Sequence, residues 1–530
     1  MSPSSSERTP LLRNGSSDLA ADSDYAPATS SHSKERPKGE LVWTLAALWS
    51  AVFLSSLDNT IVATLVTPIG SYFNASHQAS YLGTSYLLSV CCFTPLYGRL
   101  ADILGRREAM LVALTFFGVG TLLCGLAGSM IALIVARAVA GVGGGGIITV
   151  ASVSLSDLVP LKQRAVYQGL GAIVLGLGAG LGGPLGGFLN DLLGWRWAFL
   201  LQIPILAISI ILVILKANVP YPMKPTTLLQ KLARIDWLGS LSLVAFVGCF
   251  LVAITLKTAE EMPWSSPSVW GLITVSGVSG VSFVLVEAFG SPEPILPLRL
   301  LKQRTPLSVA LANFAISLVV YSTLYNVPLY FSAVRLQSAS EAGAHLLPNS
   351  VVIALGSLFA GWIMRATGKH WFLSIASAGA AILSCLLMAN WNDGTSTFEL
   401  WFDIVPSGAG TSSLFGTTLI ALISSVSRED MAVANGIYYL FRTTGQVLGV
   451  SMSGALAQGI LRTQLRSRID VPNAKEIRHS TSVISTLEPE LRDAAVASWA
   501  IALRAVFIFN AAFAFLALLA CLPIEEYELP

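Results

Sequence analysis

Fourteen apolar stretches, each long enough for a membrane-crossing helix, follow one another from about Trp43 to Pro523. A helix needs about 20 mostly apolar residues to cross the hydrocarbon core of a bilayer. Composition agrees with this pattern, since 54% of the residues are hydrophobic and only 12% are charged, about half the charged fraction of a soluble domain. The sequence therefore predicts an all-α polytopic membrane protein with 14 transmembrane helices, whose main partner is the lipid bilayer.

The predicted spans are 43–66, 79–101, 109–128, 131–154, 165–189, 197–216, 236–256, 268–288, 307–332, 343–364, 371–390, 398–424, 432–460 and 499–522. An even number of spans places both termini on the same side of the membrane. The short loops on that side carry fifteen Lys and Arg residues, whereas those on the other side carry only Arg196, Lys257 and Arg335. Because basic loops stay in the cytosol, both termini are predicted to be cytosolic.

A short sequence repeat indicates two related halves. Segments 98–107 and 361–370 follow the second and tenth spans, and each has two glycines seven residues apart with basic residues after the second. A substrate site is expected where such halves meet. The predicted organisation is a disordered cytosolic tail 1–40, a six-helix bundle 41–216, a linker with two extra helices 217–290, a six-helix bundle 291–523 with a long non-cytosolic loop 461–498, and a cytosolic tail 524–530.

Asp58 lies inside the first span, where a charged side chain costs roughly 2.5 to 3.5 kcal/mol and by default marks a transport pathway. Arg137 lies inside the fourth span and is always charged, so it needs a partner, for which Asp58 is the nearest candidate. Burial disfavours the charged carboxylate and a nearby arginine favours it, so Asp58 is a candidate proton carrier. The alternatives are a fixed structural Asp–Arg pair, an arginine that binds backbone carbonyls, or an Asp58 that binds a substrate ammonium.

Other polar residues inside spans are candidates for a transport cavity. Arg442 in the thirteenth span either pairs with Asp403 in the twelfth or meets a substrate carboxylate. The ninth span places hydrogen-bonding side chains at roughly helical spacing, which suits either a cavity wall or interhelical hydrogen bonds. These residues are Asn313, Tyr321, Tyr325 and Asn326.

The segment 98–107 is the most specific local motif, because its glycines allow a tight turn and its acid lies among arginines. Its residues Gly98, Arg99, Asp102, Gly105, Arg106 and Arg107 resemble the signature loop of the major facilitator superfamily. The resemblance implies a latch that holds the inner ends of the two halves together; the alternative is a loop that only sets topology. In the second copy Arg365 stands at the aspartate position.

Five further segments extend the resemblance. The glycine-rich fifth span, with Gly180, Gly183, Pro184 and Gly187, resembles the antiporter signature of the drug:proton antiporters. Segments 57–62 and 195–199 resemble the 14-span branch of that group, and segments 325–331 and 435–449 look like the fungal vacuolar basic amino acid transporters. The resemblance implies the major facilitator fold, two six-helix bundles plus two inserted helices, with Asp58 and Arg137 in proton coupling.

The function that the resemblance implies is proton-coupled antiport of lysine, arginine or histidine from the cytosol into the vacuole. The alternatives are a plasma-membrane exporter of drugs or toxins and a non-transporting nutrient sensor. Glu7, Leu11 and Leu12 match an acidic di-leucine signal for a sorting adaptor or are a chance match in a tail, and Asn74 begins a possible glycosylation sequon. The sequence predicts a monomer with no enzyme activity, cofactor, metal or nucleic acid.

Overall fold

The computed structural model describes residues 38–159, 161–216, 237–258, 262–290, 298–426, 431–469 and 481–526, together with Ile477. Every regular element within these ranges is a helix. Ten of the described helices are long and apolar enough to cross a membrane, and two shorter apolar helices accompany them. The predicted all-α class is confirmed.

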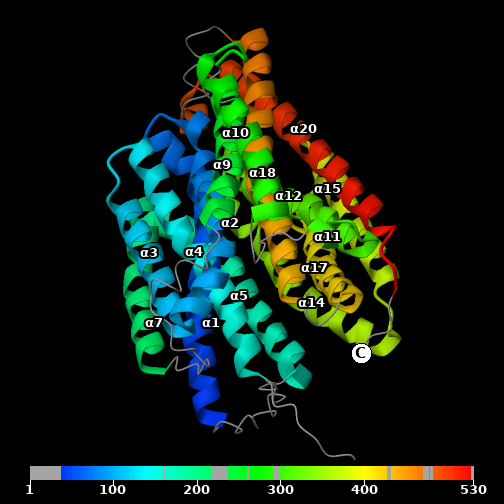
Figure 1. Ribbon diagram of the computed structural model, residues 1–530. Helices are drawn as coiled ribbons and strands as arrows, with labels where there is room; N and C mark the ends of the chain where they lie inside the picture. The colour runs from blue at the N-terminus through cyan, green and yellow to red at the C-terminus, as the bar shows by residue number, and fades with distance from the viewer. Residues whose placement is uncertain are drawn as a thin grey trace, which may run out of the picture.

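The N-terminal bundle contains seven helices that pack against one another (Figure 1). They are α1 (Lys38–Tyr72), α2 (Tyr81–Leu104), α3 (Arg106–Leu126), α4 (Met130–Leu158), α5 (Leu161–Leu193), α6 (Trp195–Leu200) and α7 (Gln202–Lys216). Helices α6 and α7 follow one another closely and together make the sixth predicted span. A short 3-10 turn, η1 (Ser76–Gln78), precedes α2.

The C-terminal bundle repeats this arrangement. Its helices are α12 (Arg304–Ala333), α13 (Ala339–Ala344), α14 (Leu347–Thr367), α15 (Trp371–Ala389), α16 (Thr397–Phe402), α17 (Val405–Ser425), α18 (Met431–Arg468) and α20 (Pro489–Cys521), with the short α11 (Leu298–Leu301) and η3 (Thr481–Thr486). The pairs α13–α14 and α16–α17 each make one predicted span.

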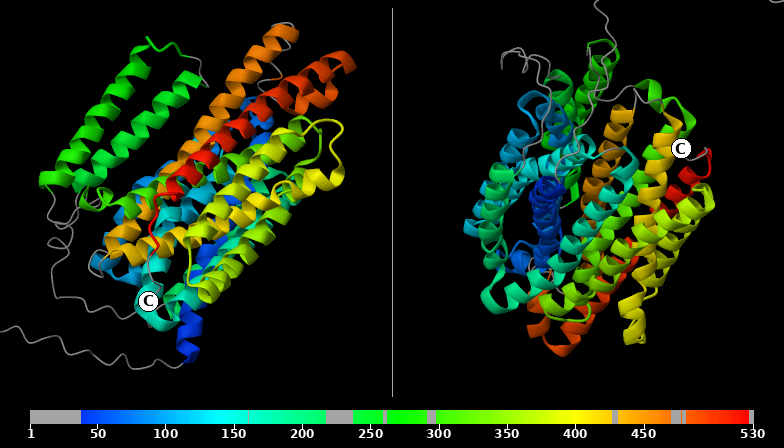
Figure 2. Two further views of the ribbon diagram at one scale, coloured as in Figure 1. Left: turned by 90° about the vertical axis from the view of Figure 1, so that its right-hand side faces the viewer. Right: turned by 90° about the horizontal axis from the view of Figure 1, so that it is seen from below.

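Two further helices, α9 (Trp237–Thr258) and α10 (Pro267–Leu285), form the predicted insert, and the π-helical turn η2 (Val286–Gly290) ends it. They lie side by side at the edge of the molecule (Figure 2). Helix α9 contacts α2 and α18, one helix from each bundle. The predicted fold of two six-span bundles plus two inserted helices is confirmed.

The structure extends two helices into the predicted outer loop 461–498. Helix α18 continues to Arg468, and α20 begins at Pro489 rather than near residue 499. Both extensions carry charged residues, such as Arg466 and Glu490, which a search for apolar stretches excludes but a helix outside the hydrocarbon accepts. Hydropathy therefore locates the membrane-embedded part of a helix and not its ends.

The second glycine of each copy lies where two helices join, whereas Gly98 and Gly361 lie inside α2 and α14. Gly105 separates α2 from α3 with φ of 100°, and Gly368 caps α14 before α15 with φ of 68°. Positive φ is costly for residues with a Cβ atom, so glycine permits these joints. The predicted tight turns are confirmed in both copies.

The two bundles contact each other along their outer parts, where "outer" denotes the helix ends that the basic loops predict to lie away from the cytosol. Helix α5 packs against α13 and α14, and α2 packs against α18. Hydrogen bonds join Thr84 Oγ1 to Ser451 Oγ at 3.1 Å and the backbone N of Ser340 to Asp191 Oδ2 at 3.2 Å. The structure is therefore a state closed on the outer side.

Glycines on α5 allow this closure. A Cβ atom added to Gly178, Gly182 or Gly186 would collide with α1 in the same bundle. Another set, Gly176, Gly180, Gly183 and Gly187, faces α13 and α14 of the other bundle. Small residues let helix backbones approach closely in a membrane. Helix α5 thus packs tightly on both bundles. Its role in antiport, which the resemblance implies, remains a prediction.

We expect Gly187→Ala to weaken the outer closure, because the added Cβ would collide with the backbone of Ala339 and Ser340. Spin labels at positions 190 and 338 should report a longer or broader distance distribution in this variant. Gly248→Ala is the matched control, because a Cβ atom added there would meet nothing within 4 Å beyond the adjacent part of its own helix. An unchanged distribution in Gly187→Ala would contradict the closure described here.

Candidate functional site

Asp58 and Arg137 form a buried ion pair between α1 and α4. Arg137 Nη1 donates a hydrogen bond to Asp58 Oδ2 at 2.6 Å, and both side chains are 0% exposed. The sequence predicted each charge but could not establish that they meet. Removing two charges from water costs several kcal/mol per ion, and only close pairing offsets that cost.

Other groups hold the guanidinium in place. Arg137 Nε donates to the backbone oxygen of Leu82 on α2 at 3.4 Å, and Arg137 Cζ lies 4.2 Å from the ring centroid of Tyr86. The Tyr86 hydroxyl is within 3.3 Å of Ser55 Oγ on α1. A cation over an aromatic face is stabilised by the ring quadrupole. Arg137 therefore links three helices of the N-terminal bundle.

Gln202 contacts the same carboxylate, and sequence reasoning missed it. Gln202 Nε2 donates to Asp58 Oδ1 at 3.4 Å and to the backbone oxygen of Ala198 at 2.9 Å. Its side chain is almost fully buried at the start of α7. The available signal was an amide inside an apolar span, because polar side chains in a membrane face the protein interior.

This arrangement can carry a proton. In the ionised form Asp58 accepts hydrogen bonds from both Arg137 and Gln202. Protonation would remove the charge attraction to Arg137 and leave the guanidinium free to move. An exchange between these two forms is the chemistry that proton coupling requires.

Arg442 lies in the other bundle and is not paired with Asp403. Its Cζ lies 4.0 Å from the ring centroid of Phe415 on α17. Asp403 caps the end of α16, before α17 begins at Val405, and accepts a hydrogen bond from Trp391 Nε1 at 2.9 Å. Within the described residues, no carboxylate forms an ion pair with Arg442.

Two tyrosines accompany Arg442. Tyr321 on α12 and Tyr438 on α18 lie close enough to interact with its charge, and the Tyr438 hydroxyl donates to the backbone oxygen of Phe415 at 3.0 Å. Arg442 itself is half-buried. A half-buried guanidinium beside hydroxyl groups can bind the carboxylate of a ligand by donating hydrogen bonds to it.

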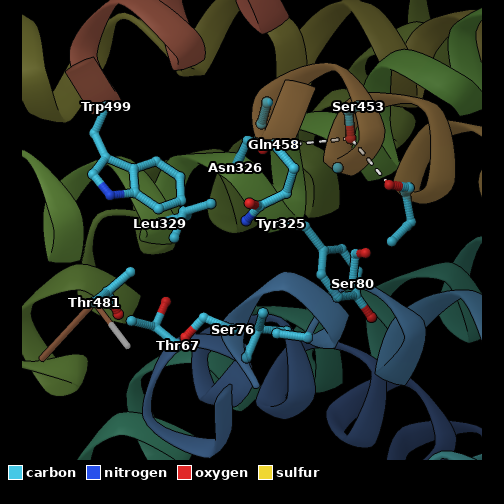
Figure 3. A pocket seen from close by; sticks show the side chains of 15 residues that line it. Thr67, Ser76, Ser80, Tyr325, Asn326, Leu329, Ser453, Gln458, Thr481 and Trp499 are labelled. Atoms are coloured by element: carbon cyan, nitrogen blue, oxygen red, sulfur yellow. Dashed lines mark hydrogen bonds between the residues drawn. The ribbon is translucent and has the colours of Figure 1, made fainter. Parts of the chain in front are cut away.

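The remaining ninth-span candidates have different surroundings. Asn313 makes an interhelical hydrogen bond to Thr418 Oγ1 at 3.1 Å, the second of the two predicted alternatives. Asn326 donates to Ser453 Oγ on α18 at 2.9 Å. Tyr325 and Asn326 both line a cavity of about 50 Å³ (Figure 3).

This cavity lies between the outer ends of the two bundles. Hydroxyl and amide groups face it from both sides (Figure 3). The N-terminal bundle contributes Thr67, Ser76 and Ser80, and the C-terminal bundle contributes Asn326, Ser453, Gln458, Thr481 and Trp499. Among the described residues, the wall of the cavity has polar side chains and no charged one.

The loop predicted as a latch makes its described contacts inside the N-terminal bundle. Arg106 Nε lies 2.7 Å from Asp157 Oδ2 at the end of α4. Arg107 Nη2 donates to the backbone oxygen of Ile214 in α7 at 2.7 Å. The side chains of Arg99 and Asp102 lie outside the described part of the chain, so a latch to the other bundle remains a prediction.

The remaining predictions concern glycosylation, sorting and metal binding. Asn74 is exposed on the connection between α1 and η1, where a glycan would find access. Glu7, Leu11 and Leu12 lie outside the described residues. Within the described ranges, no group of three or more His, Cys, Asp or Glu residues could hold a metal ion.

Comparison with known proteins gives one family. The family model described as Major Facilitator Superfamily matches residues 48–450. The fold also resembles a crystal structure of a bacterial homolog of the human lysosomal transporter Spinster in an inward-facing and occupied conformation, with a TM-score of 0.62, 17% identity and coverage of 93% of this chain and 98% of that one.

Curated relatives are of two kinds. The chain is 38% identical to the multidrug resistance protein fnx1 of Schizosaccharomyces pombe, over 92% of this chain and 93% of the relative. It is 36% identical to the vacuolar membrane amino acid uptake transporter fnx2 of the same species, over 84% and 78%. It is 33% identical to the vacuolar basic amino acid transporter 1 of Saccharomyces cerevisiae, over 77% and 76%.

We expect Asp58→Asn to lower the free energy of unfolding by about 3 to 5 kcal/mol, because it leaves a buried guanidinium without its charge partner. Arg137→Gln should destabilise the protein similarly. The double variant should lose much less than the sum, because it buries no unpaired charge. Thermal unfolding in detergent measures all three; strictly additive losses would show that the pair contributes no coupling energy.

Proposed function

This chain belongs to the major facilitator superfamily, and we propose that it is a proton-coupled antiporter that moves basic amino acids from the cytosol into the vacuole. Membership makes it a multi-pass membrane transporter of small molecules and not an enzyme. The single observation that supports proton coupling best is the fully buried contact between Asp58 and Arg137.

The proposed cycle uses the two forms of this pair. When the outer side opens, Asp58 takes a proton from the acidic lumen, and the substrate leaves. When the inner side opens, Asp58 releases the proton, pairs again with Arg137 and allows cytosolic substrate to bind. The closed outer side and the contact between Asp58 and Arg137 fit the second stage.

Arg442 supports an amino acid as the substrate. A cation inside a membrane protein without a carboxylate partner is costly, and a substrate carboxylate would reduce that cost. Tyr321 and Tyr438 add hydroxyl groups near the same position. A cationic drug without an acid group offers no such anion, so this feature favours amino acids over drugs of that kind.

The membrane assignment depends on relatives. Two relatives are named as vacuolar amino acid transporters, and the name of one specifies basic amino acids. The predicted di-leucine signal with Leu11 and Leu12 agrees with a vacuolar destination.

Multidrug export at the plasma membrane is the second candidate. It is favoured by the 38% identity to a multidrug resistance protein over nearly the whole chain. A fluorescent fusion with and without Leu11 and Leu12 separates the two candidates: vacuolar residence supports amino acid uptake, and residence at the cell surface supports export.

We expect Asp58→Asn to abolish ATP-driven lysine uptake by isolated vacuolar vesicles, because an amide cannot exchange the coupling proton. Uptake is normalised to the amount of transporter in the vesicles, and Gly248→Ala is the control. Undiminished uptake in Asp58→Asn would reject Asp58 as the proton carrier.

We expect the wild type to prefer lysine to cadaverine, which has both amino groups but no carboxylate. Arg442→Gln should raise the KM for lysine at least several-fold and remove most of this preference, because the carboxylate would lose a charge-assisted hydrogen bond. Competition of each compound against labelled lysine measures the preference. An unchanged preference in Arg442→Gln would exclude contact with the carboxylate.

A further inference from the structure

We propose that the ring of Tyr325 is the barrier that keeps protons on the outer side away from Asp58 while the outer side is closed. The inference rests on the proposed proton coupling, because a coupled antiporter must not let protons reach the carrier from both sides at once. It assigns a coupling role to a residue of the C-terminal bundle that makes none of the hydrogen bonds of the ion pair.

Tyr325 crosses the boundary between the two bundles. It belongs to α12, yet a Cβ atom added to Gly83 on α2 would lie 2.5 Å from its Cζ and hydroxyl oxygen. The tip of the ring therefore occupies space that exists only because residue 83 has no side chain. Tyr325 is only 6% exposed, so the ring fills this space rather than facing water.

The residues next to Gly83 connect this contact with the ion pair. The backbone oxygen of Leu82 accepts the hydrogen bond from Arg137 Nε, and Thr84 bonds to Ser451 on α18. The charges of Asp58 and Arg137 also lie within electrostatic reach of the Tyr325 hydroxyl. Three consecutive residues of α2 thus contact the proton site, the aromatic ring and the opposite bundle.

The outer cavity lies on the other side of Tyr325. Its wall includes buried Ser76 Oγ, Gln458 Oε1 and Trp499 Nε1, which have no hydrogen-bond partner among the described residues (Figure 3). Buried polar atoms of this kind are normally satisfied by water. A cavity of about 50 Å³ has room for a few water molecules, at roughly 10 to 15 Å³ each on this measure.

The ring therefore lies between the ion pair and a cavity whose unsatisfied polar atoms can bind water. An aromatic ring provides no chain of hydrogen bonds through its carbon atoms, so protons in the cavity would stop there. When the bundles part on the outer side, α12 would carry the ring away from Gly83. Asp58 would then be accessible from the outer side only in the outward-open state.

The test is the decay of a pH gradient across proteoliposomes that contain the purified full-length protein and no amino acid. Tyr325→Ala should collapse the gradient several-fold faster than the wild type, whereas Tyr325→Phe should stay tight because it keeps the ring. Tyr330→Ala is the matched control: it removes the same side chain from the same helix, but Tyr330 packs on Phe331 and Trp391 within its own bundle.

Gly83→Ala tests the same barrier with the tyrosine present, because the added methyl group would displace the ring. It should also leak, and it should add nothing to the leak of Tyr325→Ala in the double variant. The proposal would be overturned if vesicles with Gly83→Ala and vesicles with Tyr325→Ala both kept the pH gradient as long as the wild type. So would a leak in Tyr325→Phe equal to that in Tyr325→Ala, which would assign the role to the hydroxyl.

The leak is independent of the proposed substrate. If the wild type exchanges no lysine for protons but the variants leak as expected, the assigned function fails and the barrier stands. If the wild type exchanges lysine and Tyr325→Ala vesicles remain tight, the barrier fails and the assigned function stands.

Discussion

The buried ion pair between Asp58 and Arg137 is the constraint on which the rest of the structure depends. Two full charges at 0% exposure are tolerable in a membrane only while they remain in contact. The pair therefore fixes α1 against α4, and its neighbours Leu82 and Gln202 extend that constraint to α2 and α7. The same dependence makes the pair sensitive to a single proton, since neutralising Asp58 removes the reason for the contact.

One of the contacts that close the outer side lies next to this pair. The segment from Leu82 to Thr84 meets Arg137, Tyr325 and α18 within three residues. Glycines on α5 make a second close contact between the bundles. A shift in the position of Arg137 would thus act, through residues 82 to 84, on the contact between the bundles that separates when the outer side opens. Small residues at both contacts allow the helices to close tightly.

Much of the fold could be predicted from the sequence because it follows from length and hydropathy. The fourteen spans, the inserted pair and the turns at Gly105 and Gly368 needed only the bilayer thickness and the properties of glycine. The extensions of α18 and α20 into the outer loop could not be found this way, because charged helical turns lack an apolar signal. Within the site, Asp58 and Arg137 were evident as isolated charges. Gln202, the separation of Asp403 from Arg442 and the contact of Tyr325 with Gly83 depend on helix packing, which one sequence does not specify.

The central claim is that Asp58 loses a proton when substrate binds, and counting released protons tests it most directly. Purified protein in a weakly buffered detergent solution with a pH indicator is mixed with lysine. The account predicts that the wild type releases protons when lysine is added and that folded Asp58→Asn, which has no carboxyl proton to lose, releases none. Equal release by both proteins, or lysine binding to the wild type without any release, would contradict it.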